Sequence, residues 1–130
     1  MKLRKVGEIV GVGYQKGSCN ECKQCLKGFT NVCHSHKNSR TIFPDLGGFS
    51  THMYAAEDWT FLIPNNLALE KVHPLMCAGI TVFNPLESKC RKGDKVAVIG
   101  IGGLGHMALI LGSKMGLEMT AVSSSDRKEE

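Results

Sequence analysis

Four cysteines within fifteen residues constrain this chain more than any other feature of its sequence. Cys19, Cys22, Cys25 and Cys33 form a C-x2-C-x2-C-x7-C run. Thiols three residues apart pair poorly as disulfides with one another, whereas a short irregular loop can direct all four at one tetrahedral ion. Because a site closed by four sulfurs keeps no open coordination position, the run predicts a structural zinc site.

Three other interpretations of the cysteines remain open. A disulfide framework would need a secreted chain, but the first ten residues carry no apolar stretch of signal-peptide length and no window approaches a membrane span. We therefore expect a cytoplasmic protein with no membrane association. Bacterial iron–sulfur runs also begin C-x2-C-x2-C, although their fourth cysteine follows after three residues. A nucleic-acid zinc module is disfavoured, because two separated C-x2-C knuckles are missing and the aromatic content is only 6%.

The overall composition is that of an ordinary globular protein. The chain has 130 residues, of which 42% are apolar and 22% charged, and its formal net charge of +4 comes mostly from scattered lysines. We therefore expect no nucleic-acid partner. Fifteen glycines exceed the average share and indicate turns and close backbone approaches.

The chain divides into two unlike parts. Up to about residue 75 the pattern predicts loops and short strands at 8–12, 49–55 and 60–63, with a turn at 45–48. From His73 the residues are almost wholly apolar as far as Pro85, which predicts a buried connecting helix. A second, shorter helix is expected at 85–89, followed by a turn at 92–94.

A glycine-rich loop follows the next apolar run. Residues 95–99 are near-continuously apolar, as in a buried parallel strand, and lead into G-I-G-G-L-G at 100–105. A helix is expected at 106–115 with Gly116 as its C-cap, and then a strand at 119–122. In this context Gly100 would make a tight turn, Gly102 would let backbone approach a pyrophosphate, and Gly105 would allow close helix–strand packing. A glycine-rich turn without a ligand is the alternative.

The residues after the second strand bear on the choice of cofactor. A carboxylate there normally accepts the ribose 2′-hydroxyl, but this chain has Ser123-Ser124-Ser125, followed by Arg127 and Lys128. Hydroxyls and cations suit a 2′-phosphate, which favours NADP over NAD. Asp126 could still reach the ribose after a small register shift, and a solvated polar turn is a further alternative.

A four-cysteine lobe followed by a strand, glycine loop, helix and strand resembles the zinc-dependent medium-chain alcohol dehydrogenases, and most of all their cinnamyl alcohol dehydrogenase-like branch. The resemblance covers nearly the whole chain. It is carried by segments 6–13, 17–33, 47–50 and 77–82, by the glycine loop, and by 123–125. It implies a mixed β and α/β fold. Residues 1–83 would form part of a GroES-like catalytic domain with the zinc lobe at 17–36, and 84–130 would begin an NADP-binding Rossmann domain with a doubly wound parallel sheet.

The resemblance also implies roles for particular residues. The four clustered cysteines would hold the structural zinc, Cys77 would be one ligand of a catalytic zinc, and Thr81 would lie near the nicotinamide. The pyrophosphate would be lined by Gly100, Gly102, Gly103, Leu104 and Gly105. The 2′-phosphate would be bound by Ser123, Ser124, Ser125 and Lys128. Without the resemblance, Cys77 would be interpreted as a buried apolar thiol.

The implied activity is reversible hydride transfer between NADP(H) and a small-molecule alcohol or aldehyde, with a homodimer as the full-length form. The family's other catalytic-zinc ligands would precede Met1, and most of its nucleotide domain would follow Glu130. The chain is therefore expected to be a fragment that is inactive alone. Two other classes stay open, namely a non-catalytic zinc- or nucleotide-binding remnant and an unrelated metal-containing interaction module.

Overall fold

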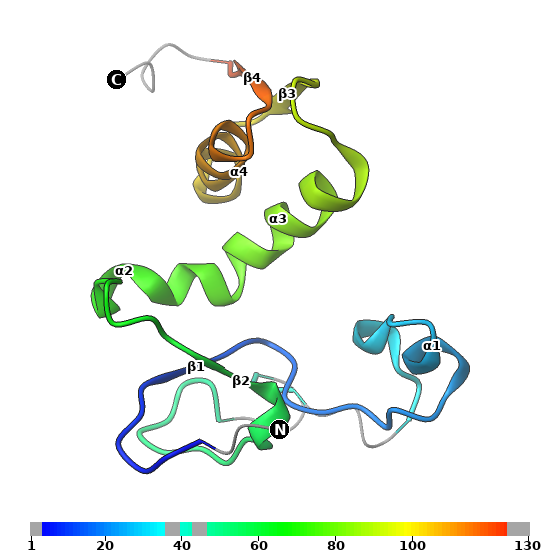
Figure 1. Cartoon of the computed structure of the whole chain (residues 1–130), viewed down its shortest axis with the longest axis vertical. Helices are drawn as coiled ribbons and strands as arrows, with labels where there is room; N and C mark the ends of the chain where they lie inside the picture. The colour runs from blue at the N-terminus through cyan, green and yellow to red at the C-terminus, as the bar shows by residue number, and fades with distance from the viewer. Residues whose placement is uncertain (1–3, 36–39, 43–46, 125–130) are drawn as a thin grey trace. The chain divides into compact units, whose positions relative to one another are not determined.

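The computed structural model describes residues 4–35, 40–42 and 47–124 (Figure 1). The chain divides into two compact units, Met1–Lys71 and Val72–Glu130. The domain boundary expected between residues 83 and 84 is inferred from the family's two domains, whereas these units are defined by their internal contacts. The expected boundary therefore stays a prediction. The turn expected at 45–48 lies partly outside the described residues.

The first unit contains a two-stranded antiparallel sheet. Strand β1 (Val10–Val12) pairs with β2 (Thr60–Leu62), with Val10 opposite Leu62. The strands expected at 8–12 and 60–63 are thus confirmed, although both are shorter than expected. The strand expected at 49–55 is wrong, because turns and bends occupy its first residues and no strand follows. Here the Ser50 hydroxyl donates to the carbonyl oxygens of Gly47 and His52, each at 2.6 Å, and such local bonds compete with a strand ladder.

Short helices make up most of the remaining regular structure of this unit. They are α1 (Lys23–Leu26), the 3-10 helices η1 (Thr30–Val32) and η2 (Glu57–Trp59), and α2 (Leu69–Val72), which crosses the boundary between the units. Helix η2 lies directly before β2 and has Glu57 and Asp58 in its first turn. The sheet is too small to be stable on side-chain packing alone, so polar contacts matter here.

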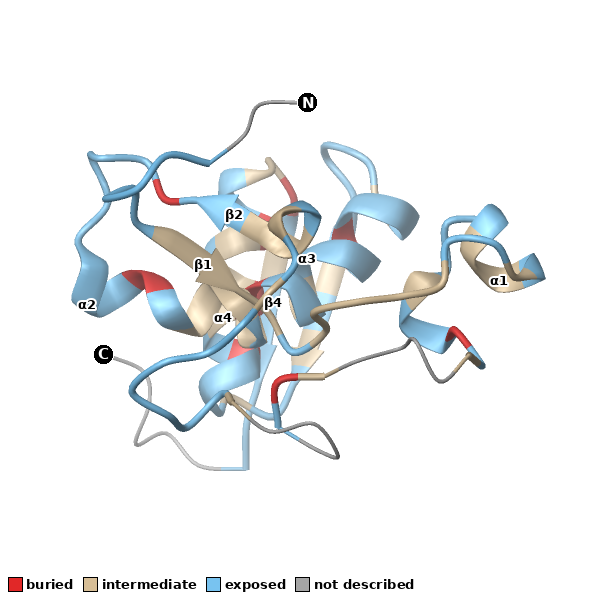
Figure 2. Ribbon diagram, turned by 90° about the horizontal axis from the view of Figure 1, so that it is seen from below, coloured by how far each residue is buried: buried red, intermediate tan, exposed pale blue. Residues whose placement is uncertain are grey.

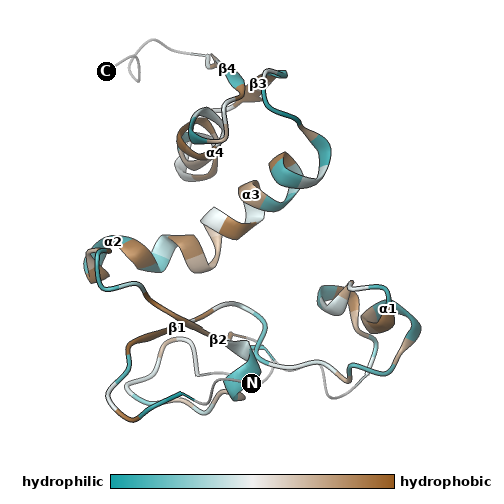
Figure 3. Cartoon of the chain, viewed as in Figure 1, coloured by the Kyte–Doolittle hydropathy of each residue, from teal (hydrophilic) through white to brown (hydrophobic). Residues whose placement is uncertain are grey.

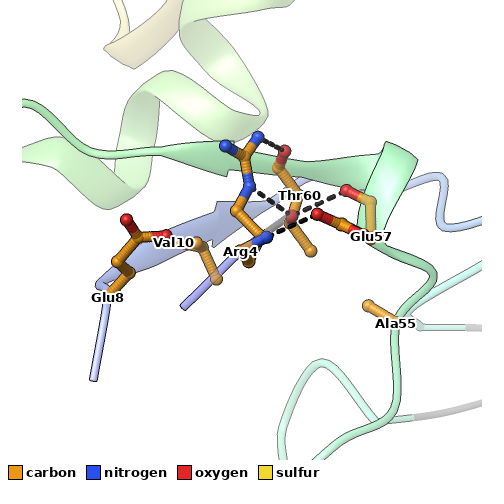
Figure 4. Close-up of a pocket in the computed structure, with 6 residues that line it drawn as sticks. All are labelled: Arg4, Glu8, Val10, Ala55, Glu57 and Thr60. Atoms are coloured by element: carbon orange, nitrogen blue, oxygen red, sulfur yellow. Dashed lines mark hydrogen bonds between the residues drawn. The ribbon is translucent and has the colours of Figure 1, made fainter. Parts of the chain in front are cut away.

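Arg4 ties the start of the described chain to β2 (Figure 4). Its Nε donates to the Thr60 hydroxyl at 3.1 Å, its Nη2 donates to the Thr60 carbonyl at 2.8 Å, and its backbone N–H donates to the Glu57 carboxylate. These groups border an open hollow of about 280 Å³, lined by Arg4, Glu8, Val10, Ala55, Glu57 and Thr60. Because most of its polar groups already bond one another, we interpret the hollow as a structural anchor rather than a ligand site.

The second unit begins with η3 (His73–Met76) and the long helix α3 (Ala78–Lys89). The expected break into two helices is wrong, since α3 runs through Pro85 to Lys89. Proline has no N–H to donate to Thr81 four residues earlier, yet the helix resumes beyond it, and Cys90 donates to the Leu86 carbonyl at 2.9 Å. Within α3 only Gly79 and Leu86 are buried, so the expected burial is limited to part of one face.

A parallel strand–helix–strand unit completes the described chain. Strands β3 (Lys95–Ile99) and β4 (Glu118–Val122) pair in parallel, with Lys95 opposite Glu118, and α4 (Gly103–Lys114) connects them. Gly116 has φ +82° and its N–H bonds the Ser113 carbonyl, while Leu117 bonds the Gly112 carbonyl. These two bonds form a Schellman motif, which confirms Gly116 as the C-terminal cap of α4.

Helix α4 packs against α3, β3 and β4. Its buried face is made of small residues, Gly105, Ala108 and Gly112, which allow a close approach (Figure 2). Apolar residues continue along α4 and β3 (Figure 3). Several of them stay uncovered, such as Ile99 at the end of β3, which is 85% exposed. In the part of the chain that is described, no helix is long and apolar enough to cross a membrane.

Candidate functional sites

The four clustered cysteines converge on one point. All four Sγ atoms lie within 4.8 Å of one another, with Cys19 3.9 Å from Cys25 and 3.5 Å from Cys33. Four sulfurs at zinc's usual bond length of about 2.3 Å form a tetrahedron with edges of roughly 3.8 Å. The observed separations fit around a single ion of that kind, so this cluster could hold a structural zinc.

The same geometry argues against two of the alternatives. All six cysteines are free thiols, which does not support a disulfide framework. In a four-iron cluster each thiolate binds a different iron atom, so the sulfurs must stand farther apart than around one ion. The short separations therefore favour zinc over an iron–sulfur cluster.

Tight local turns bring the sulfurs together. Asn20 adopts a positive φ of 57°, and its Oδ1 accepts a bond from the Ser18 hydroxyl. Asparagine tolerates this left-handed region better than most residues. The turn brings the Cys22 N–H to 3.3 Å from the Cys19 sulfur, and α1 then carries Cys25 one turn beyond Cys22. Backbone N–H donation to a metal-binding sulfur is the expected supporting contact.

Gln15 closes the base of this lobe. Its side-chain amide donates to the Gly17 carbonyl at 3.0 Å and to the Thr30 carbonyl at 2.8 Å. One side chain thereby joins the chain entering the lobe to the start of η1, which leads to Cys33. Gln15 cannot be recognised from the sequence, because nothing in a lone glutamine outside the motif signals a partner fifteen residues away.

The thiols of the cluster differ in acidity. The backbone N–H of Cys25 chiefly lowers the pKa of Cys22 to about 6. Burial chiefly raises the pKa of Cys25 to about 11, and the neighbouring Cys22 thiol adds to the rise. The pKa of Cys33 is lowered, mainly by the backbone N–H of Cys19. Crowded thiols cannot all ionise without a compensating cation, and a divalent ion would supply that charge.

The glycine loop gives its three spaced glycines three distinct environments. Gly100 has φ +89°, a conformation that favours glycine, and its N–H bonds the Val122 carbonyl at the end of β4. A Cβ on Gly105 would overlap the Gly100 carbonyl oxygen, so only glycine allows this approach of α4 to the strand end. A Cβ on Gly102 would meet nothing within 4 Å, which leaves its backbone open to a ligand. The turn expected at Gly100 and the close packing expected at Gly105 are thus present, while the pyrophosphate contact expected at Gly102 stays a prediction.

Helix α4 begins at Gly103, directly after Gly102, rather than at residue 106 as expected. Its first turn therefore contains Gly103, Leu104 and Gly105, whose N–H groups have no acceptor within the helix. Leu104 is 51% exposed and Gly105 is buried. A helix start with open glycine backbone fits a phosphate group.

Cys77 and Thr81 occupy the start of α3. Both are exposed, and the Thr81 N–H donates to the Cys77 carbonyl at 3.0 Å. Cys77 is thus not a buried packing thiol. Among the described residues the cysteine lobe is the single group of three or more metal-ligating side chains, so Cys77 has no partners there for a catalytic ion. Its predicted role, and that of Thr81, stay predictions.

The serine run begins where β4 ends. Ser123 and Ser124 are exposed directly after Val122. They follow the same end of the parallel strands as the Gly100 turn, because the Gly100 N–H donates to the Val122 carbonyl. Ser125 and Lys128 lie outside the described residues. The predicted 2′-phosphate site stays a prediction.

Curated relatives match the chain over its whole length. Cinnamyl alcohol dehydrogenase 7 from Arabidopsis thaliana is 39% identical over 137 aligned residues, covering 100% of this chain and 38% of that protein. Aldehyde reductase AdhA from Synechocystis is 41% identical over 126 residues, covering 96% of this chain and 37% of the relative. The chain therefore spans less than two fifths of the curated relatives it matches. No protein-family model matches it.

Solved structures show the same fold. A cinnamyl alcohol dehydrogenase from Helicobacter pylori complexed with NADP(H) aligns with a TM-score of 0.84 at 36% identity, covering 99% of this chain and 40% of that one. An enzyme of the same name from Sorghum bicolor aligns with a TM-score of 0.82 at 35% identity, covering 98% and 38%. These likenesses confirm the expected GroES-like and Rossmann-type fold class. Over the segment that it spans, the chain is therefore homologous to the cinnamyl alcohol dehydrogenases, whose solved structures have the fold of zinc-dependent alcohol dehydrogenases.

Proposed function

We propose that this chain supplies the structural-zinc lobe and the dinucleotide loop of an NADP(H)-dependent alcohol dehydrogenase, which interconverts an alcohol and its aldehyde. One observation carries the proposal. The glycine loop, with its separate backbone roles, lies in a chain that aligns over 99% of its length with a cinnamyl alcohol dehydrogenase complexed with NADP(H).

The nicotinamide ring of NADP(H), when bound, accepts or donates the hydride. The residues of this chain would hold and orient the dinucleotide. The N–H groups of Gly103, Leu104 and Gly105 would donate to the pyrophosphate oxygens at the positive end of α4. Ser123 and Ser124 would bind the 2′-phosphate together with Ser125 and Lys128, where a carboxylate would repel it.

The substrate end of the site would lie at the start of α3. Thr81, one helical turn after Cys77, would face the nicotinamide and the reacting alcohol or aldehyde. The described residues do not by themselves fit a catalytic zinc, because Cys77 belongs to no group of three metal-ligating side chains among them. Paired subunits belong to the same proposal and rest on the family alone. A cytoplasmic location belongs to it too and rests on the use of the cysteines as free metal-binding thiols.

Nucleotide binding tests the proposal directly. NADPH and NADH are titrated into the full chain and followed by nucleotide fluorescence, and NADPH is expected to bind more tightly. Gly102→Ala is the informative variant, because a methyl group there meets nothing in the protein and the backbone φ of −101° suits alanine. Its circular dichroism should match that of the parent, while NADPH binding should be lost.

Each other outcome has a distinct meaning. If the parent chain binds neither nucleotide, the proposal is wrong. If Gly102→Ala binds as well as the parent, the loop is a turn without a ligand. Binding of NADPH without any reduction of an aldehyde is the result expected of this chain on its own, because within the described residues Cys77 belongs to no group of metal-ligating side chains.

A further inference from the structure

We propose that the imidazole of His106 binds the pyrophosphate of the dinucleotide held at the glycine loop. The proposal rests on the nucleotide-binding function above and adds a side chain to a site that otherwise consists of backbone N–H groups. His106 would act as a phosphate-binding residue that positions the cofactor.

The position of His106 in α4 directs its side chain toward the loop. Its N–H donates to the Gly102 carbonyl at 2.8 Å, which places it one turn beyond the loop. In an α-helix the Cα–Cβ bond tilts toward the N-terminus, so a side chain covers the turn before its own Cα. For His106 that turn holds Gly102 and Gly103. Neither has a side chain, and a Cβ on either would meet nothing within 4 Å.

The imidazole is available for such a contact. His106 is exposed, and within the described part of the chain no hydrogen bond or ion pair engages its ring. A phosphate oxygen over Gly102 would therefore meet both the backbone N–H groups of the first turn and an uncommitted ring nitrogen. A protonated ring would add a charge-assisted hydrogen bond.

Charged side chains on the packed elements lie at the other end of the unit. Lys95 and Glu118 begin β3 and β4, while the glycine loop follows the end of β3. Lys114 ends α4, and Glu87 and Lys89 lie in the last turn of α3, which leads to the start of β3. Two thiols flank α3, Cys77 at its N-terminal cap and Cys90 at its C-terminal cap. Within the described residues, no carboxylate competes with a phosphate for His106.

ADP-ribose is the probe that isolates this contact. It carries the pyrophosphate but no 2′-phosphate, and its pyrophosphate does not change charge between about pH 6 and 8, where histidine gains or loses a proton. Calorimetric titration of the full chain is expected to show binding about tenfold tighter near pH 6 than near pH 8. His106→Gln keeps a hydrogen-bond donor without the charge, so its affinity should not vary with pH.

His52→Gln is the matched control. His52 is another exposed histidine, its Nδ1 lies 3.1 Å from the Thr51 hydroxyl, and its removal should leave the pH dependence intact. Circular dichroism of both variants checks that the fold is kept. A second titration uses adenosine 2′-monophosphate, which carries the 2′-phosphate without the pyrophosphate. If His106→Gln abolishes the pH dependence of binding with this ligand only, His106 contacts the 2′-phosphate. That result would overturn the proposal.

The remaining outcomes separate this proposal from the one on which it rests. A parent chain that binds neither ADP-ribose nor NADPH would refute both proposals, whereas binding of NADPH without binding of ADP-ribose would refute the role of His106 alone. Binding of equal strength at the two pH values, or a pH dependence that survives in His106→Gln, would refute the role of His106 and leave the nucleotide site standing.

Discussion

The close approach of α4 to the glycine loop makes Gly105→Ala a sharp test of the structure. The added Cβ would overlap the Gly100 carbonyl oxygen and would lie 3.2 Å from its carbonyl carbon and 3.4 Å from Val98 Cγ1. The obstacle is backbone at a turn with φ +89°, so the helix and the loop must separate by most of an ångström. Overpacking of this kind costs typically 1–3 kcal/mol, against roughly 0.5–1 kcal/mol gained by replacing a helical glycine.

We expect Gly105→Ala to destabilise the second unit by about 1–2 kcal/mol, which corresponds to a melting temperature lowered by roughly 5–15 °C in a domain of this size. Gly112→Ala is the matched comparison in the same helix. Its Cβ would also clash, but with Met119, whose Sδ it would overlap and whose Cε lies 2.7 Å away; this flexible side chain can move aside. Its net effect should be within about 0.5 kcal/mol of zero.

Thermal and urea unfolding of the parent and the two variants, followed by circular dichroism, measure the difference. Equal stability of Gly105→Ala and Gly112→Ala would refute the reasoning, because it would show that the Gly100 backbone yields as easily as a methionine side chain. A Gly112→Ala variant less stable than Gly105→Ala would refute it as well.

Two further predictions concern the cysteine lobe. Gln15→Ala removes two hydrogen bonds, to the Gly17 and Thr30 carbonyls, worth about 1 kcal/mol each. The variant should therefore lose zinc to a chelator roughly tenfold faster than the parent. An unchanged rate of zinc loss would show that Gln15 does not close the lobe. In the metal-free chain, Cys22, with its pKa near 6, should be alkylated by iodoacetamide at neutral pH ahead of Cys25, with its pKa near 11. The alkylation rate of Cys22 should fall as the pH drops through about 6, and one zinc per chain should protect both thiols. Mass spectrometry of the labelled peptides measures which thiol reacts first. Preferential labelling of Cys25 would contradict the prediction.

Features encoded in local sequence could be predicted, and those that depend on distant partners could not. The spacing of the cysteines shows that one short loop could bring four sulfurs together, and the spacing of Gly100, Gly102 and Gly105 shows where the backbone must turn or approach closely. The metal cluster and the loop could therefore be predicted from the sequence. The apolar runs of β3 and β4 were equally clear. By contrast, the strand predicted at 49–55 took no account of the Ser50 hydroxyl, which holds a bend there.

The helix boundaries predicted at proline and glycine residues differ from those of the structure for physical reasons. Pro85 predicted a break, but the loss of one donor near the end of α3 was tolerated. Gly103 and Gly105 predicted a loop, yet both are helical in α4, because Gly105 is needed for packing and Gly103 starts the first turn. Gln15 could not be identified at all, since its value depends on the Thr30 carbonyl.

The register of β1 and β2 has a consequence for how the chain folds. Val10 pairs with Leu62, 52 positions along the chain, whereas Lys95 pairs with Glu118 after only 23. Closing the longer loop costs about 0.7 kcal/mol more entropy, and non-local pairing slows folding. Zinc binding would order residues 19–33 within that loop and so shorten its effective length. Metal taken up early in folding would therefore accelerate pairing of the first sheet, while the β3–α4–β4 unit would form at a rate independent of zinc.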